Sequence, residues 1–285
     1  MDILSVLKNE SSAMSKGQRR IADYILDYYD KAAFMTANRL GKAVDVSEST
    51  VVRFAVQLGY DGYPAMQKAL QKVVRNKLTS VQRIEVVNDM LASQDVASMV
   101  LCADMDTLQS TNEALDRSAF EGAVDAISKA RHVYIAGARS SSILAGFMNY
   151  YLRNMLDSVK MVESTAMSEM FEQLVHIGAE DVIICISFPR YSSGTIKAVN
   201  YCKQAGATVI SLTDSHQAPA ANGADHVLVA KSEMVSIVDS LVAPMSIINA
   251  ILVAVGRRKE AELASTYAKL ERIWEENEVY ERYDT

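Results

Sequence analysis

The sequence predicts an α/β protein in which an all-helical N-terminal region is joined to a region built on a five-stranded parallel sheet. Three observations support this prediction. Near the N-terminus, apolar residues recur at helical spacing. After residue 131, short β-rich segments alternate with helical ones, which is typical of a parallel sheet with helices on both faces. The chain has 285 residues, 49% of them hydrophobic, which is enough for two domains.

The first helix is predicted in the segment SKGQRRIADYILDYYDK, which begins at Ser15. Ser15 and Gln18 form a capping box, in which each side chain bonds to the other residue's backbone N–H. Ile21, Ile25 and Tyr28 follow at helical spacing. We therefore expect a helix with one apolar face.

Two further helices are predicted around a tight turn at residues 44–46. Thr36 can cap a short helix before this turn, and Ser47 can cap a second helix that runs to about Leu58. The expected buried stripe of the second helix is Val51, Phe54, Ala55 and Leu58. The glycines of GYDGY, residues 59–63, end this helix.

A helix, a tight turn and a second helix that begins with short polar residues are typical of a helix-turn-helix reader of DNA. Residues 1–80 carry a net charge of +4 and the remaining chain −10, so the helical region is the basic one. Periodicity alone leaves open a small helical bundle that binds nothing. The candidate DNA-binding residues are Thr36, Arg39, Ser47, Glu48, Ser49, Thr50 and Arg53.

The segment VSESTVVRFAVQLGYDGYPAMQKAL resembles the N-terminal domain of the RpiR family of bacterial transcriptional regulators. The resemblance covers roughly residues 1–77 and implies a DNA-binding domain there. This chain has Asp45 where the family often has glycine, and aspartate tolerates the left-handed conformation. It has Gly41 where alanine is common, which should weaken the short helix by roughly 1 kcal/mol.

A helical connector is predicted over residues 78–117, because DVASMVLCADMDTLQSTNEAL has apolar residues at helical spacing. Ser118 and Glu121 are expected to form a second capping box that opens the next helix. The apolar side of this connector can pack against a second subunit or against other helices of the same chain.

Five strands are expected after the connector, and helical segments separate the first four. The expected strands are 132–136, 158–162, 181–187, 207–213 and 226–230. The expected helices are 141–155, 166–176 and 194–205. Near-continuous apolar runs such as VIICI fit strands that are buried on both faces.

Two polar loops follow strands of this sheet: GARSSS at 137–142, and SFPRYSSGT at 187–195. Each leads into the start of a helix, where free backbone N–H groups bind anions. With the strand order 2-1-3-4-5, the first and third strands are neighbours and both loops flank one crevice. The alternative is that their serines and threonine only cap helices.

Residues from about 120 to 255 resemble an SIS (sugar isomerase) domain, which implies an αβα sandwich and a phosphosugar ligand. The family pattern Gly-x-Gly-x-Ser matches Gly137 to Ser141, with Arg139 in place of the second glycine. The pattern Ser-x-Ser-Gly-x-Thr starts at Ser187, but FPRY intervenes. The candidate ligand-binding residues are Arg139, Ser140, Ser141, Ser142, Ser187, Arg190, Ser192, Ser193, Thr195 and Glu169.

The resemblance implies a regulator of carbohydrate metabolism. The alternative is a sugar-phosphate isomerase, for which the candidate bases are Glu163, Glu169, Glu172 and His176. The DNA-binding head favours a sensor, so we expect no catalytic residue and no cofactor. The expected partners are a palindromic DNA operator, a sugar phosphate, and a second or further copies in a homodimer or homotetramer. The predicted domains are residues 1–77, 78–117, 118–255 and a last helix within 256–285.

Three scattered cysteines indicate a reducing compartment, and the histidines lack metal-ligand spacing, so we expect a cytoplasmic protein without a metal site. The apolar segment 237–255 contains Asp239, Pro244 and Asn249, which favours a buried helix over a membrane span. The last helix is expected to be amphipathic and to pack on the sheet or on a neighbour. Its apolar side consists of Leu263, Tyr267, Leu270 and Trp274.

Overall fold

The computed structural model of the protein describes residues 3–10, 14–75, 79, 81–82, 84, 95–163, 166–232 and 238–280. Contacts divide the chain into two compact units, residues 1–100 with 234–239 and residues 101–233 with 240–285. Parts of the predicted connector (78, 80, 83 and 85–94) and of the predicted last segment (281–285) lie outside the described residues. Each unit has its own hydrophobic core.

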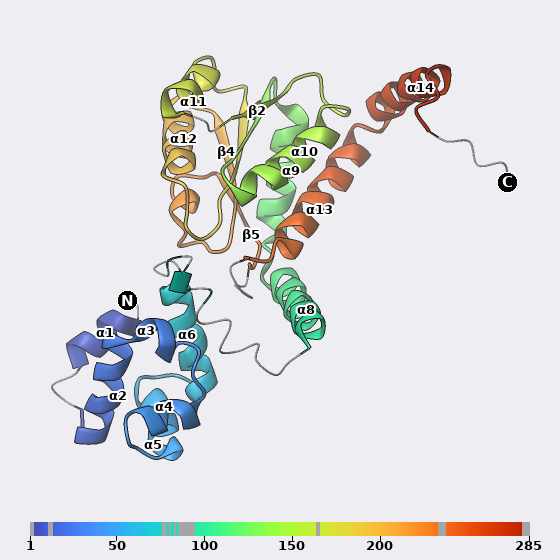
Figure 1. The fold of residues 1–285 in the computed structure, drawn as a ribbon. Helices are drawn as coiled ribbons and strands as arrows, with labels where there is room; N and C mark the ends of the chain where they lie inside the picture. Colours follow the sequence, from blue (N-terminus) through green and yellow to red (C-terminus); the bar gives the residue numbers. More distant parts are fainter. Residues whose placement is uncertain are drawn as a thin grey trace. The chain divides into compact units, whose positions relative to one another are not determined.

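The first unit is helical (Figure 1). It contains α1 (Ile3–Glu10), α2 (Lys16–Asp27), α3 (Tyr29–Ala32), α4 (Ala37–Ala43), α5 (Glu48–Gln57) and α6 (Tyr63–Arg75). The predicted capping box is confirmed at the start of α2, where Ser15 and Gln18 bond to each other's backbone. Ile21 and Ile25 are buried as expected, but the prediction that Tyr28 belongs to the same apolar face is wrong. It lies beyond the last turn of α2 and is 49% exposed.

The turn between α4 and α5 is held by polar contacts and by close packing. Asp45 has the left-handed φ of 52° that the sequence suggested. The Arg20 guanidinium donates to the carbonyl oxygens of Val44 and Asp45 and forms an ion pair with the Asp45 carboxylate at 3.0 Å. A Cβ on Gly41 would lie 2.8 Å from the Val46 carbonyl oxygen. The expectation for Gly41 considered helix propensity alone, and this close approach is an opposing effect that favours glycine.

Two helices lead into the sheet, α8 (Val96–Ala114) and α9 (Arg117–Lys129). The predicted capping box of Ser118 and Glu121 is wrong, because Asp116 is the N-cap of α9. Its carboxylate accepts from the backbone N–H groups of Ser118 at 2.9 Å and Ala119 at 3.0 Å. A carboxylate at this position satisfies two free donors of the first turn and so sets the start of the helix.

The second unit contains a five-stranded parallel sheet with the order β2-β1-β3-β4-β5, which confirms the predicted topology. Its strands are β1 (Val133–Gly137), β2 (Val159–Val162), β3 (Val182–Ile186), β4 (Thr208–Thr213) and β5 (His226–Val229). Every residue of β1 and β3 is buried, as expected for strands covered on both faces.

Helices cover both faces of this sheet. α9, α10 (Ser140–Leu152) and α13 (Val242–Arg258) pack on one face, and α11 (Met167–Leu174) and α12 (Ser193–Gln204) on the other (Figure 1). The apolar segment predicted at 237–255 therefore forms, from Val242 onward, the core helix α13. No helix among the described residues is long and apolar enough to cross a membrane. α14 (Glu260–Glu276) follows α13 and has no buried residue.

Candidate functional site

The first candidate site lies where β1 and β3 end, at the carboxyl edge of the sheet. These strands are adjacent, and Gly137 at the end of β1 pairs with Ile186 at the end of β3. Both strands then lead into helices, so the N-termini of α10 and α12 lie at this edge. A Cβ on Gly137 would lie 2.5 Å from the Ser141 carbonyl oxygen, so glycine is required for α10 to start this close to the strand.

The loop after β1 places one exposed arginine and three serines at the N-terminus of α10. Arg139 is the residue before the helix and has a φ of 57°, a conformation that costs about 1–3 kcal/mol for a residue other than glycine. Ser140 is exposed, whereas Ser141 is buried in the first turn. The Ser142 hydroxyl donates to the Arg139 carbonyl oxygen at 2.6 Å and so holds the loop.

The loop after β3 contains a buried hydroxyl that the sequence alone does not reveal as special. The Ser187 side chain is 3% exposed, and its oxygen has no hydrogen-bond partner among the described residues. Because side chains alternate along a strand, Ser187 shares with Cys185 the sheet face that α12 covers. The exposed Arg190 has a φ of 61° and marks the turn of this loop.

The same loop ends in the first turn of α12. Ser192 is the N-cap and its hydroxyl oxygen accepts from the Thr195 backbone N–H at 3.4 Å. Ser193 is exposed and Thr195 is buried. The structure thus gives Ser192 a capping role, and it brings the other predicted residues of this loop to one helix N-terminus.

Glu169 lies in the first turn of α11, after β2, and its side chain is exposed. The Gln173 side chain ties this segment together, because its amide nitrogen donates to the Glu163 and Glu169 carbonyl oxygens, each at 3.1 Å. Glu172 is also exposed. Since β2 is the neighbour of β1, Glu169 follows the same edge of the sheet as the two polar loops.

Sequence analysis did not identify two residues of this edge, Tyr191 and Asp214. The Tyr191 hydroxyl donates to the Asp214 carboxylate at 2.8 Å, which joins the loop after β3 to the segment after β4. The polar run TDS that follows the apolar part of β4 is the signal that could have revealed Asp214. This hydrogen bond fixes one side of the loop that carries Arg190.

The second candidate site is the outer face of α5 in the first unit. Val51, Phe54 and Ala55 are buried, so the opposite face is exposed. That face carries Ser49, Val52, Arg53 and Val56. The predicted polar residues are therefore accompanied by two exposed valines, 38% and 58% exposed, which sequence reasoning missed.

The remaining predicted DNA-binding residues surround the turn between α4 and α5. The Thr36 hydroxyl accepts from the Arg39 backbone N–H at 3.2 Å, and Arg39 itself is exposed. The Ser47 hydroxyl caps α5 by accepting from the Thr50 backbone N–H at 3.2 Å. The Glu48 carboxylate accepts from the Asn38 side chain at 3.1 Å, which links the two helices.

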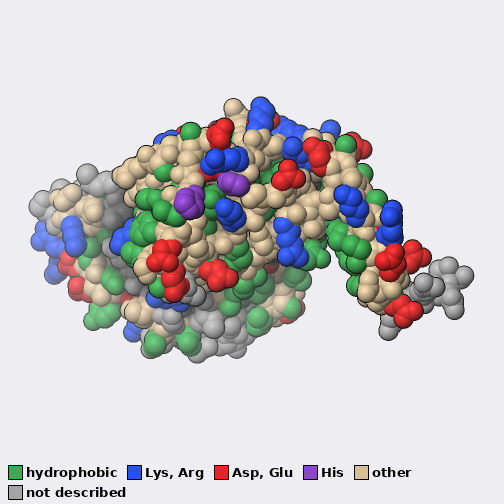
Figure 2. Space-filling model, turned by 90° about the horizontal axis from the view of Figure 1, so that it is seen from above, with side chains coloured by type: hydrophobic (Ala, Val, Ile, Leu, Met, Phe, Trp, Pro, Cys, Tyr) green, Lys and Arg blue, Asp and Glu red, His purple; other side chains and the backbone are tan. Residues whose placement is uncertain are grey.

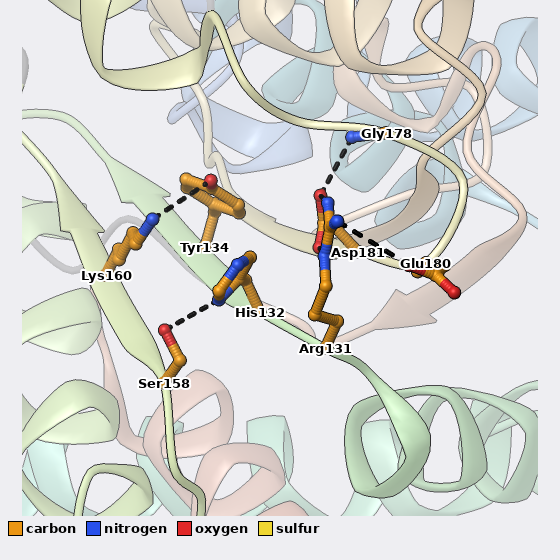
Figure 3. A network of polar contacts seen from close by, with 8 residues as sticks. All are labelled: Arg131, His132, Tyr134, Ser158, Lys160, Gly178, Glu180 and Asp181. Carbon is orange, nitrogen blue, oxygen red and sulfur yellow. Dashed lines mark hydrogen bonds and ion pairs between the residues drawn. The ribbon is translucent and has the colours of Figure 1, made fainter.

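The most tightly held carboxylate of the second unit lies at the opposite, amino edge of the sheet (Figure 3). The Asp181 side chain accepts from Arg131 at 2.8 and 3.0 Å and from the Gly178 backbone N–H at 2.8 Å. Burial raises the pKa of Asp181, but these hydrogen bonds outweigh it, so the pKa lies below its ordinary value. This network joins the starts of β1 and β3 and is separate from the candidate site at the carboxyl edge.

Comparison with known proteins gives two family matches. Residues 1–77 match the helix-turn-helix domain of the rpiR family, and residues 126–254 match the SIS domain. An HTH-type transcriptional regulator of Clostridium perfringens is 27% identical over 230 residues, which cover 80% of this chain and 81% of that protein. The HTH-type transcriptional regulator HexR of Escherichia coli is 26% identical over 216 residues, covering 75% and 73%.

Two solved structures share the fold. The sugar isomerase domain of an RpiR transcription factor from Sphaerobacter thermophilus is 27% identical, with a TM-score of 0.60, and covers 63% of this chain and 99% of its own. The Vibrio vulnificus NanR protein, solved with ManNAc-6P, is 21% identical, with a TM-score of 0.58, and covers 95% and 98%.

The helical unit with its exposed α5 and the unit with the parallel sheet define a transcriptional regulator that combines a helix-turn-helix domain and an SIS domain. The chain belongs to the RpiR family of these regulators. Among the described residues, no group of three or more His, Cys, Asp or Glu is placed to hold a metal ion.

Proposed function

We propose that this regulator senses a phosphosugar, or a related sugar acid phosphate, at the carboxyl ends of β1 and β3. The observation that carries the proposal is the buried Ser187 hydroxyl, which has no hydrogen-bond partner among the described residues. An unpaired buried hydroxyl is costly, and a phosphate oxygen is an acceptor that would satisfy it. Free N–H groups at the start of α12, and the exposed guanidinium groups of Arg139 and Arg190, add donors suited to the same anion.

The DNA-binding part of the proposal rests on the exposed face of α5. In a helix-turn-helix domain, residues near the start of the second helix contact base edges in the major groove. Ser49 and Arg53 lie on that face, and Arg39 is exposed on α4. A homodimer or homotetramer would present two such helices to half-sites about 34 Å apart in a palindromic operator. Ligand would then act by favouring one arrangement of the two DNA-binding domains.

The regulator is favoured over a sugar-phosphate isomerase. A catalytic base for proton transfer must lie within hydrogen-bond reach of the substrate proton. Glu169 and Glu172 both lie exposed on α11. Relatives that match 75–90% of this chain are HTH-type transcriptional regulators.

The test is a thermal-shift screen with a panel of sugar phosphates that begins with ManNAc-6P, each paired with its unphosphorylated sugar. A ligand that binds the folded form at about 100 times its Kd stabilises it by roughly 2.7 kcal/mol. We expect stabilisation by a phosphorylated compound only, and its reduction in Ser141→Ala and Arg190→Ala. Equal stabilisation by the unphosphorylated sugar would contradict the proposed site. So would a ligand-induced stabilisation in Ser141→Ala and Arg190→Ala as large as in the wild type.

A further inference from the structure

The helix α14 carries an apolar stripe that the described residues cover only in part. Leu263, Tyr267, Leu270 and Trp274 lie on one side of this helix, and each of them is half-buried. Tyr267 and Trp274 contact each other with ring centroids 6.3 Å apart. Tyr280 extends the aromatic cluster, with its ring 5.5 Å from that of Trp274. In water such a stripe is unfavourable, and contiguous apolar surface that remains accessible often marks an interface.

The connection between α13 and α14 explains why the stripe is covered only in part. α13 ends at Arg258 and α14 begins at Glu260, so Lys259 alone links them. Two antiparallel helices need a loop of about two to five residues between them. α14 therefore does not fold back along α13, and it extends beyond the end of that helix (Figure 1). Among the four stripe residues, Leu263 lies nearest to α13, against Gly256.

The same unit presents an apolar groove between α10, α13 and the start of α14. It has a volume of about 600 Å³. Its lining includes Phe147 and Tyr151 from α10, Met155 from the turn after α10, and Leu252 and Val253 from α13. Val253 is 65% exposed. Figure 2 shows hydrophobic side chains along one side of the C-terminal segment.

The stripe is somewhat longer than the groove. It extends over 12 residues of α14, from Leu263 to Trp274, about 16 Å at the helical rise of 1.5 Å per residue. The α13 side of the groove extends from Asn249 to Arg257, about 12 Å, and the other side extends from Phe147 on α10 to Met155 beyond the end of that helix. A helix laid along the groove would thus place its aromatic residues over the exposed rings and Val253.

Charged side chains border both surfaces. Arg257 and Glu260 both line the groove and are exposed, and the exposed Arg153 at the end of α10 lies over the Tyr150 ring at 5.2 Å. On α14, the exposed Glu271 follows Leu270 and lies beside the stripe in its second half. Opposite charges at the rim favour correct orientation on association.

We propose that α14 of one copy docks in the groove between α10 and α13 of a second copy, and that the second α14 docks reciprocally in the first. If fully buried, the aromatic side chains of Tyr267 and Trp274 on α14, with Tyr280 just after it, remove at most about 450–750 Å² per copy from water. Two helices give about 900–1,500 Å² before the groove surface is counted, against about 1,200–2,000 Å² for a stable interface. The inference does not depend on the proposed ligand, because it concerns the opposite face of the unit from α11 and α12.

Trp274 is the only tryptophan of the chain, so its fluorescence reports on α14 directly. The experiment uses the full chain without ligand or DNA, and combines Trp274 emission with sedimentation equilibrium over a dilution series. The variants are Leu270→Asp in the stripe and Val253→Asp in the groove. Their matched controls are Ala268→Asp, exposed on the other side of α14, and Val175→Asp, a valine 57% exposed at the end of α11.

We expect dilution of the wild type to shift the Trp274 emission to longer wavelength as the dimer dissociates. Leu270→Asp and Val253→Asp should produce this shift at concentrations where the wild type is dimeric, and raise the dimer Kd at least tenfold. Both controls should behave as the wild type. Emission of Val253→Asp equal to that of the wild type would overturn the proposal, even if the chain dimerises through another surface.

A mixture of the two variants tests reciprocity. A mixed dimer of Leu270→Asp and Val253→Asp keeps one intact α14 in one intact groove, so the mixture should associate more tightly than either variant alone. A mixture as weak as its components would exclude the reciprocal arrangement. Neither result depends on phosphosugar or operator binding, so failure here and failure of the proposed function are distinguishable.

Discussion

Replacing Ser187 by alanine should have opposite effects on the stability of the free protein and on its response to ligand. The Ser187 hydroxyl is buried and has no partner among the described residues. In the free protein it therefore carries a desolvation cost. In the proposed complex the same hydroxyl donates to the phosphate, so its removal weakens binding.

The expected magnitudes follow from the burial. An unsatisfied buried polar group costs about 1–3 kcal/mol, so Ser187→Ala should raise the free energy of unfolding of the second unit by about that amount. In a domain of this size each kcal/mol corresponds to a rise in Tm of about 2–4 °C. A hydrogen bond to a charged group contributes about 1.5–3 kcal/mol, so ligand affinity should fall roughly 10- to 100-fold.

Thermal unfolding with and without ligand measures both effects. Ser211→Ala is the matched control, because the Ser211 hydroxyl is also buried with no hydrogen-bond partner in the described part of the chain but lies inside β4. It should stabilise the free protein without changing the ligand response. If Ser187→Ala destabilises the free protein, or if it retains wild-type ligand affinity, the reasoning about this hydroxyl is wrong.

Three further predictions concern other parts of the chain. Gly41→Ala should lower the free energy of unfolding of the first unit by up to about 2 kcal/mol in urea titration. Overpacking against the Val46 carbonyl costs about 1–3 kcal/mol, which outweighs the roughly 1 kcal/mol gained in helix propensity. Asp181→Asn should lower stability by about 1.5–3 kcal/mol at pH 7, since it loses the charge that bonds to Arg131. The pKa of Asp181 is depressed in the folded state, so this difference should persist above about pH 4 and disappear as the pH falls through the folded pKa. Arg53→Ala should weaken operator binding by about 1–3 kcal/mol in fluorescence anisotropy.

Each of these variants has a control. A Cβ on Gly17 would have only ordinary contacts, the nearest 3.6 Å from Val46, so Gly17→Ala should not destabilise. Glu180→Gln removes an exposed partner of Arg131 and should change stability little. Lys68→Ala removes an exposed cation on α6 and should leave operator binding nearly unchanged. A Gly41→Ala protein more stable than the wild type would contradict the first prediction. The second would be wrong if the difference in unfolding free energy between Asp181→Asn and the wild type stayed constant down to pH 2.

Local sequence signals predicted most of the fold. Caps work within one helical turn, so Ser15 with Gln18, Thr36 and Ser47 were found at their observed positions. The prediction failed at Ser118 because Asp116 competes for the same N–H groups, and a carboxylate that satisfies two of them sets the helix start. The five strands and their order were also predicted, because buried parallel strands have continuous apolar runs.

The sequence by itself determined the classes of residue at the two candidate sites, because a polar loop between a buried strand and a helix is visible in the residues that form it. Only the tertiary structure decided that Ser187 lacks a hydrogen-bond partner among the described residues, that Gly41 faces a carbonyl oxygen and that no residue of α14 is buried. These properties depend on which atoms distant in the chain approach one another, and residue spacing carries no such information.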